Sequence, residues 1–251
     1  MSVNAKLDRV ALFGATSAIA QETGRILAGR GAALVVVGRD PRKLSAVADD
    51  LRARGAARVD SVQADLDEVG RHAALVDGAA EALGGLYAVV IAQGVLGDQE
   101  ESARDVAAAE RVLVGNFVGP ALLAQAAATR LAAQGAGTIV GISSVAGDRG
   151  RGSNYTYGAA KGGFSLFLQG LRNRYAPAGV QVLTVKPGFV DTPMTAHLEK
   201  SALFATPARV AAGIVRAAER GRDVVYAPGF WRLVMAVIRA IPERIFKRLK
   251  L

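Results

Sequence analysis

Short apolar runs alternate with longer segments of helical periodicity over the first half of the chain. Apart from Val59–Gln63, which carries Asp60 and Ser61, the runs lack the regular polar positions of a half-exposed strand, and this is typical of strands buried on both faces of a sheet. Repeated strand and helix segments predict parallel strands joined by right-handed crossovers. The predicted strands are Val10–Phe13, Ala33–Val37, Val59–Gln63 and Tyr87–Ala92, and the predicted helices lie near Ala18–Gly29, Pro41–Arg54 and Glu68–Leu83.

Two further apolar runs, Thr138–Ser143 and Gln181–Lys186, continue this pattern in the second half. We therefore predict an α/β fold with a single Rossmann-type, doubly wound parallel sheet and helices on both faces. In such a fold, ligands bind beyond the carboxyl ends of the strands. No Pro- or Ser-rich linker divides the 251 residues. We expect one domain over residues 1–229, with a substrate lid at about 193–206, followed by a distinct segment at 230–251.

Composition narrows the function classes. The chain has no cysteine, which excludes disulfides, thiolate metal sites and cysteine catalysis, and fits a reducing, cytoplasmic compartment. We expect no metal site. The net charge of +9 fits NADP, an acidic carrier protein or an anionic membrane. Nucleic acid is not expected as a partner, because no basic stripe is interleaved with aromatic residues. No run of about 18 uninterrupted apolar residues occurs, so no membrane-spanning helix is expected.

Tyr157 and Lys161 are the strongest candidates for chemistry. Their spacing of four residues places them on one face of a helix, whereas Tyr155 points nearly the opposite way. A phenol has a pKa of about 10, and a neighbouring ammonium stabilises the phenolate. Ser144 follows a predicted strand and would project its hydroxyl into the same cleft. Taken alone, the pair could also be an exposed amphipathic pair on a helix.

Ser144, Tyr157 and Lys161, together with the Gly14 loop, Asn116 and Pro187-Gly188, resemble the short-chain dehydrogenase/reductase family over essentially the whole chain. This resemblance implies hydride transfer to a carbonyl carbon. Tyr157 would be the general acid, Lys161 would lower its pKa and bind the nicotinamide ribose, and Ser144 would hold the carbonyl oxygen. Asn116 would bend a long helix and join a proton relay with the lysine, although a purely structural asparagine is the alternative.

The family resemblance also implies a set of cofactor-binding residues. The first turn would hold the pyrophosphate, yet alanine stands at two positions, 18 and 20, where the family has glycine. A plain strand-to-helix turn is the alternative there. Gly94 would admit the ribose, Asp65 and Leu66 would hold the adenine, and Tyr157 and Lys161 would contact the nicotinamide ribose. The remaining predicted contacts are Gly14, Thr16, Ser17, Ala18, Ile19, Pro187, Gly188, Val190 and Thr192.

The residues after the second strand bear on the choice of cofactor. Arg39, with Arg42 or Lys43 nearby, suits a 2′-phosphate, so NADP(H) is favoured over NAD(H). Asp40 keeps NAD possible, and its alternative role is to cap the next helix.

Several other polar residues are weaker candidates. We expect His197 to have a surface role and His72 to be a bystander on an outer helix. Asp148, Arg149 and Arg151 would border the cleft and could meet an anionic substrate, with a solvated turn as the alternative.

The C-terminal segment has apolar residues at 230, 234, 237, 238, 241, 245 and 249 and basic residues at 232, 239, 244, 247, 248 and 250. This pattern predicts an amphipathic helix with a cationic face, interrupted near Pro242. The helix could lie on an anionic membrane, which would place the protein at the inner membrane face, or it could pack on the domain or a dimer mate.

The tail, with the segments 95–98, 196–198 and 226–228, resembles the subgroup of reductases that act on decaprenylphosphoryl keto-pentoses. We therefore expect an NADPH-dependent reductase of a small or lipid-linked ketone. A 3-oxoacyl carrier-protein reductase is one alternative, and a non-catalytic NADP-sensing or scaffold protein is another. The family resemblance also implies a homodimer or homotetramer.

Overall fold

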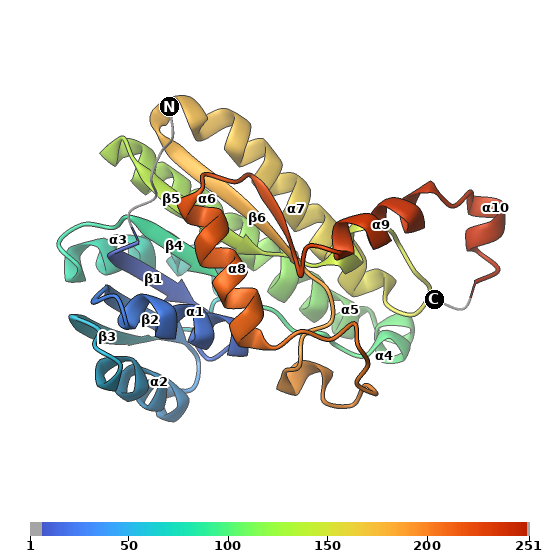
Figure 1. Cartoon of the computed structure of the whole chain (residues 1–251), viewed down its shortest axis with the longest axis horizontal. Helices are drawn as coiled ribbons and strands as arrows, with labels where there is room; N and C mark the ends of the chain where they lie inside the picture. The colour runs from blue at the N-terminus through green and yellow to red at the C-terminus, as the bar shows by residue number, and fades with distance from the viewer. Residues whose placement is uncertain (1–6, 250–251) are drawn as a thin grey trace.

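The computed structural model describes residues 7–249 and forms one seven-stranded parallel sheet between two layers of helices (Figure 1). The strand order is β3-β2-β1-β4-β5-β6-β7, and every pairing is parallel. The predicted doubly wound fold is confirmed. The strands are β1 Arg9–Phe13, β2 Ala33–Gly38, β3 Arg58–Gln63, β4 Ala88–Ile91, β5 Gly137–Ile142, β6 Val180–Pro187 and β7 Val224–Ala227.

Alternate side chains of each central strand enter two separate apolar cores. Val10 and Leu12 of β1 face one core, and Ala11 and Phe13 face the other. Because both faces are covered, the strand sequence is continuously apolar. The first core is covered by α1 Ala18–Ala28, α2 Pro41–Ala53 and α8 Pro207–Glu219, and the second by α3 His72–Ala82, α6 Gly119–Gln134 and α7 Tyr155–Tyr175.

The remaining elements lie around the carboxyl ends of the strands or along the connections. Two short helices, α4 Gln99–Arg104 and α5 Val106–Leu113, precede a π-helical turn at Val114–Val118 that leads into α6. The tail forms α9 Trp231–Ala240 and α10 Glu243–Phe246, which extend beyond the main body in Figure 1. The 3₁₀ turns are η1 Val69–Arg71, η3 Val145–Asp148, η4 Ala176–Ala178 and η5 Pro193–Thr195.

The continuous helical stretch Val106–Gln134 is long and apolar enough to cross a membrane by length and composition, with a mean hydropathy of 1.4. In the fold, however, Leu123 and Leu131 of this stretch are completely buried in the second core. Packing against the sheet therefore accounts for its apolar composition.

Candidate active site

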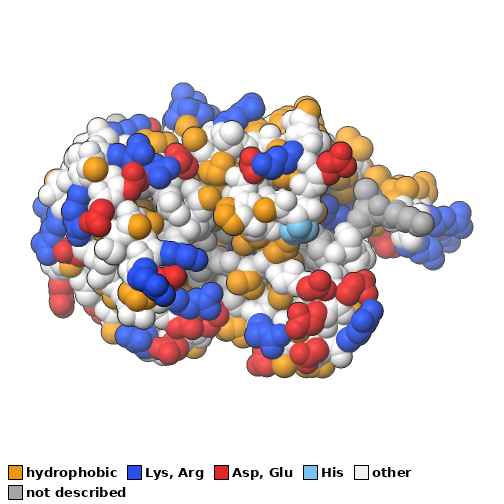
Figure 2. Space-filling view, turned by 90° about the horizontal axis from the view of Figure 1, so that it is seen from below, with side chains coloured by type: hydrophobic (Ala, Val, Ile, Leu, Met, Phe, Trp, Pro, Cys, Tyr) orange, Lys and Arg blue, Asp and Glu red, His pale blue; other side chains and the backbone are white. Residues whose placement is uncertain are grey.

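A cavity of about 880 Å³ lies at the carboxyl ends of the strands, where the sheet order reverses between β1 and β4. Residues from the first turn, the β4 loop, α7 and the β6 loop line it together. Figure 2 shows this edge of the sheet as a hollowed face, with hydrophobic side chains in the hollow and charged side chains around it. The cavity brings together all of the candidate catalytic residues, Ser144, Tyr157, Lys161 and Asn116.

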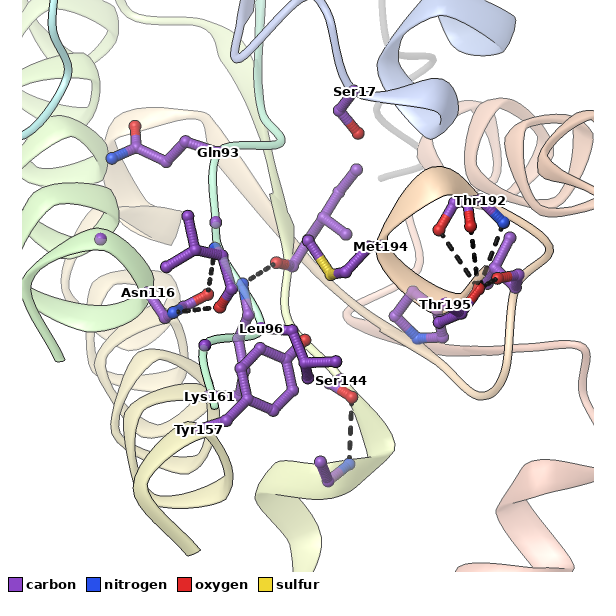
Figure 3. A pocket seen from close by; sticks show the side chains of 18 of the residues that line it. Ser17, Gln93, Leu96, Asn116, Ser144, Tyr157, Lys161, Thr192, Met194 and Thr195 are labelled. Carbon is purple, nitrogen blue, oxygen red and sulfur yellow. Dashed lines mark hydrogen bonds between the residues drawn. The ribbon is translucent and has the colours of Figure 1, made fainter. Parts of the chain in front are cut away.

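Tyr157 and Lys161 occupy successive turns of α7 and face the cavity beside Ser144 (Figure 3). The Lys161 side chain is almost completely buried, with its residue 4% exposed, and its Nζ donates to the carbonyl of Ile142 at 3.1 Å. Ser144 Oγ accepts from the amide of Ala146 at 3.1 Å, and its hydroxyl also forms a hydrogen bond with Tyr157. Tyr155 is 48% exposed and does not line the cavity, as its helical phase predicts.

Burial shifts the pKa values of both groups in opposite directions. It raises the pKa of Tyr157 to about 12, against a smaller lowering by a hydrogen bond with Ser144. It lowers the pKa of Lys161 to about 8. In this arrangement burial outweighs the lowering of the Tyr157 pKa that the family resemblance implies for Lys161. The Lys161 ammonium lies 5.8 Å from the centroid of the phenol ring and bonds elsewhere, so burial dominates. At neutral pH the phenol keeps its proton.

Asn116 lies in the π-helical turn and is completely buried. Its Nδ2 donates to the carbonyls of Val95 at 2.7 Å and Val112 at 2.8 Å, while its Oδ1 accepts from the amide of Val95 at 3.2 Å. Asn116 therefore ties the widened helix to the loop after β4.

Gly94 brings this loop next to the lysine. It has φ +157°, and a Cβ at this position would lie 2.6 Å from Asn116 Oδ1 and 3.2 Å from Lys161 Nζ. Only glycine allows the loop, the asparagine and the lysine to approach this closely.

The first turn forms a compact loop despite its alanines. Gly14 has φ +75°, and a Cβ there would lie 2.6 Å from the amide nitrogen of Gln93, so this glycine cannot be replaced without a backbone shift. The amides of Gly14 and Ala15 donate to the carbonyl of Val37 at 3.0 Å. Ser17 stands at the N-cap of α1 with no side-chain cap bond, so its hydroxyl is available to a ligand. The five predicted residues Gly14, Thr16, Ser17, Ala18 and Ile19 all line the cavity.

Arg39 and Asp40 have separate roles after β2. Arg39 is exposed and lines the cavity. The Asp40 carboxylate instead caps α2, accepting from the amides of Arg42 at 3.0 Å and Lys43 at 3.1 Å. These amides hold the pKa of Asp40 below its usual value, with the Lys43 amide as the largest cause. Asp40 is absent from the cavity lining, and so are Arg42 and Lys43.

Asp65 and Leu66, the predicted adenine contacts, both line the cavity. A third residue, His72, supports the backbone of Leu66. His72 Nε2 is 2.9 Å from the carbonyl oxygen of Leu66, and the histidine is only 2% exposed. Burial lowers the pKa of His72, so the neutral ring donates to this carbonyl. His72 does not line the cavity, and its role is structural because it fixes the backbone of Leu66. Asp67 also lines the cavity and was not foreseen.

Pro187 ends β6, and the loop after it carries Gly188, Val190 and Thr192; all four residues line the cavity. Trp231 from α9 packs against this loop, lines the same cavity and was not foreseen as a site residue. A Cβ at Gly188 would lie 1.9 Å from the indole Nε1 of Trp231.

The segment from 193 to 206 begins with η5, and Ala205 then returns to pair with Val190. Met194, Leu198 and His197 from this segment line the cavity, with Met194 across from Ser144 in Figure 3. His197 is exposed and lies at the rim of the cavity.

Two of the three polar residues expected near the cleft have structural partners. Asp148 accepts from the Tyr226 hydroxyl at 2.7 Å and forms an ion pair with Lys186. Arg149 donates to the carbonyls of Ile238 and Ile241 at 2.9 and 2.6 Å. The suggestion that these two meet the substrate is therefore wrong. Arg151 does line the cavity.

The tail packs on the domain through a face that differs by one residue from the predicted one. Trp231, Met235 and Phe246 are buried, and Trp231 and Met235 pack against Val145 of η3. Of the predicted apolar stripe, positions 234 and 238 pack against this cluster, whereas positions 230, 237, 245 and 249 are exposed. The predicted basic position 250 lies outside the described residues.

Comparison with known proteins matches the chain to a family model, to oxidoreductase sequences and to a solved dehydrogenase structure. Residues 8–202 match the family model of the short chain dehydrogenases. The chain is 36% identical over 240 residues to an uncharacterized oxidoreductase of Mycobacterium tuberculosis, covering 96% of each protein. It is 37% identical over 193 residues to the cis-4-hydroxycyclohexanecarboxylate dehydrogenase of Sinomonas cyclohexanicum, covering 76% of this chain and 77% of that protein. A crystal structure from Sinorhizobium meliloti, provisionally assigned as a short-chain alcohol dehydrogenase, superposes with a TM-score of 0.80 at 26% identity, covering 90% and 96% of the two chains.

Proposed function

Because the chain belongs to the short chain dehydrogenase family, we propose that this NAD(P)-dependent oxidoreductase reduces a ketone to a secondary alcohol with NADPH as its preferred reductant. The main support for this proposal is that Ser144, Tyr157 and Lys161 line one cavity, where the Tyr157 phenol keeps its proton at neutral pH. Loss of NADPH absorbance in the presence of a cyclic ketone tests the reaction directly.

The cavity fits a dinucleotide. Gly14 and Gly94 leave cradles that a Cβ would fill, and the unbonded Ser17 hydroxyl stands at a helix N-terminus, where phosphate binds favourably. A bound nicotinamide would supply the hydride. Contacts to the pyrophosphate would come from the first turn, and contacts to the nicotinamide from the loop after β6.

The side chains of this chain would complete the reduction. The Ser144 hydroxyl donates a hydrogen bond to the carbonyl oxygen and orients it. Tyr157 transfers its phenolic proton to the same oxygen, and the Lys161 ammonium stabilises the phenolate that remains. Lys161 is held in place by its bond to Ile142, and Asn116 fixes the adjacent Gly94 loop.

Arg39 supports the preference for NADPH. It is the predicted 2′-phosphate ligand and lines the cavity, whereas the competing Asp40 carboxylate already accepts two backbone amides. A carboxylate that caps a helix is poorly available to a ribose diol.

The substrate end of the cavity favours an apolar ketone. Phe189 stacks on Phe204 at 5.3 Å and meets Trp231 edge-on at 5.6 Å, and Met194 and Leu198 add apolar surface. We propose a keto-sugar carried by a polyprenyl phosphate, in line with the subgroup resemblance. The relative from Sinomonas cyclohexanicum is named for a compound with a secondary alcohol and a carboxylate on one ring, which makes cyclic keto acids informative test substrates. The basic surface leaves a 3-oxoacyl carrier protein as the alternative substrate.

An anionic membrane surface is the proposed partner of the tail, at the cytoplasmic face. Leu233 and Val237 are 74% and 66% exposed on α9. Exposed basic side chains at 232, 239, 244, 247 and 248 accompany them. Each basic residue near anionic lipid adds about 1 kcal/mol.

Vesicle flotation tests this partner with the full chain. Vesicles containing phosphatidylglycerol should carry the protein, whereas phosphatidylcholine vesicles should not. The double variant Leu233→Asp with Val237→Asp should lose flotation, while Leu203→Asp, an exposed apolar position outside the tail, should retain it. Equal flotation of both variants would exclude a membrane role of α9.

A homodimer or homotetramer is the proposed assembly. Leu166 on α7 and Val106 on α5 are exposed apolar residues, 69% and 85% accessible, on elements that would pack between subunits. Light scattering of purified protein measures the assembly, and a monomer at micromolar concentration would contradict it.

A further inference from the structure

Arg151 lies in the connection between η3 and α7 and lines the cavity together with Ser144 and Tyr157. Its Nε is buried and has no hydrogen-bond partner among residues 7–249. In the same part of the chain, no carboxylate forms an ion pair with its guanidinium. A cation is therefore held at the wall of the cavity without a counter-ion from the described residues.

The acidic side chains that could have neutralised Arg151 are already engaged. Asp148, three residues before it, pairs with Lys186 and Tyr226. Glu243, which borders a neighbouring hollow with Arg151, pairs with Arg149 at 2.8 Å. Burial of an unpaired charge costs free energy, and an arriving anion would offset that cost. Burial lowers the pKa of Arg151, but a guanidinium remains charged at neutral pH.

The other charged groups of the cavity have different positions or partners. Lys161 lies beside Tyr157 and bonds to Ile142, and Arg39 follows β2 at the predicted ribose end. Asp65 and Asp67 follow β3, and the exposed Asp98 caps α4 through the amide of Glu101 at 2.8 Å. Arg151 is therefore the cation available to a substrate in the part of the cavity that the structure describes.

Arg151 also borders a second hollow, whose other walls include Phe246, Lys247 and Leu249 of the tail. The oxyanion bound at Arg151 could thus be the end of the substrate, as in a carboxylate. Alternatively, the substrate could extend beyond the oxyanion into the second hollow toward α10, as in a phosphate diester. Both share one chemistry, a singly charged oxyanion that accepts from a planar guanidinium.

We propose that Arg151 is a specificity residue that binds a carboxylate or phosphate-diester oxyanion carried by the ketone substrate. This inference rests on the proposed ketone reduction, because the same cavity is used. The oxyanion lies away from the reacting carbonyl, which belongs to Ser144 and Tyr157. Discrimination between charged and neutral substrates of equal shape is the expected consequence.

Trp231 provides a direct readout because it is the single tryptophan of the chain and lines the same cavity. Its fluorescence is titrated in protein saturated with NADP⁺, using cyclohexanecarboxylate, cyclohexyl methyl phosphate and the neutral methyl ester of cyclohexanecarboxylate. At least one anion should bind about 10- to 100-fold more tightly than the ester, the range of a charge-assisted hydrogen bond. The anion that binds more tightly identifies the carboxylate or the phosphodiester source.

Arg151→Gln should remove this preference while leaving ester binding unchanged, and Arg151→Lys should retain part of it. The control is Arg220→Gln, which removes the same charge from an exposed position at the end of α8. Equal binding of anions and ester, absence of anion binding, or an unchanged preference in Arg151→Gln would overturn the inference.

The proposed reduction is tested separately with NADPH and neutral 4-methylcyclohexanone. If the protein reduces this ketone but shows no preference for anions in the fluorescence titration, the role of Arg151 is overturned and the proposed reduction stands. Failure to bind either nicotinamide cofactor would overturn the proposed function itself.

Discussion

The indole of Trp231 fills the space that a side chain at residue 188 would need, so Gly188 and Trp231 are packed as a pair. The glycine belongs to the loop after β6 and the tryptophan to α9, so this contact couples the tail to the cavity. The cavity wall and the C-terminal helix are therefore one structural unit.

Gly188→Ala should displace the indole and lower the free energy of unfolding by about 1–3 kcal/mol, as overpacking typically does. Thermal melting would show a lower Tm, and the Trp231 emission would shift to longer wavelength as the indole meets water. The matched control is Gly213→Ala in α8, where a Cβ would meet nothing within 4 Å. A wild-type Tm and emission in Gly188→Ala would disprove this packing.

Arg39→Ala should weaken NADPH binding about 10- to 100-fold, because a charge-assisted contact to the 2′-phosphate is lost. NADH binding should change little, since that cofactor lacks the phosphate. Nicotinamide fluorescence measures both constants. Arg42→Ala is the control, because Arg42 does not line the cavity. Equal losses for the two cofactors would assign Arg39 to a different role.

Lys161→Met should stabilise the cofactor-free protein while abolishing turnover. The fold lowers the pKa of Lys161 from 10.5 to about 8, so between these values the unfolded chain binds more protons and stability rises with pH. Below pH 8 the buried charge therefore costs up to about 3 kcal/mol, at about 1.4 kcal/mol per pH unit. This full difference should appear in urea unfolding at pH 7.

The same variant gives a pH test. Wild-type protein should gain stability relative to Lys161→Met as pH rises from 8 toward 10.5, and the two should converge there. Above pH 10 the raised pKa of Tyr157 acts in the opposite direction in both proteins, because the folded state then holds the extra proton. A stability difference independent of pH would show that the fold does not shift the pKa of Lys161.

Most of the sheet was predictable because its central strands are largely apolar runs, and all six predicted strands lie within one residue of the observed bounds at both ends. β7 was missed because it is a short edge strand whose Val224 is 44% exposed, so it lacks the doubly buried pattern. The candidate residues near Tyr157 were recognisable from helical spacing and from turns that need glycine.

Three site features depend on tertiary contacts that spacing does not encode. His72 acts through the carbonyl of Leu66, and Arg151 differs from Arg149 only in what surrounds it. Trp231 and Met235 were missed because the predicted apolar stripe, although it contains Ile238, did not include them. The spacing of Trp231, Met235 and Ile238 follows the i, i+4, i+7 rule and was the available signal.

Tyr157→Phe provides the most direct test of the account, measured as NADPH oxidation with a neutral cyclic ketone beside wild type and Tyr155→Phe. Removal of the phenolic proton donor should lower kcat about 10²- to 10⁴-fold, while NADPH binding stays within a few-fold of wild type. Tyr155→Phe should keep full activity, since Tyr155 lies outside the cavity. Wild-type turnover in Tyr157→Phe would contradict the claim that this chain reduces ketones through that hydroxyl.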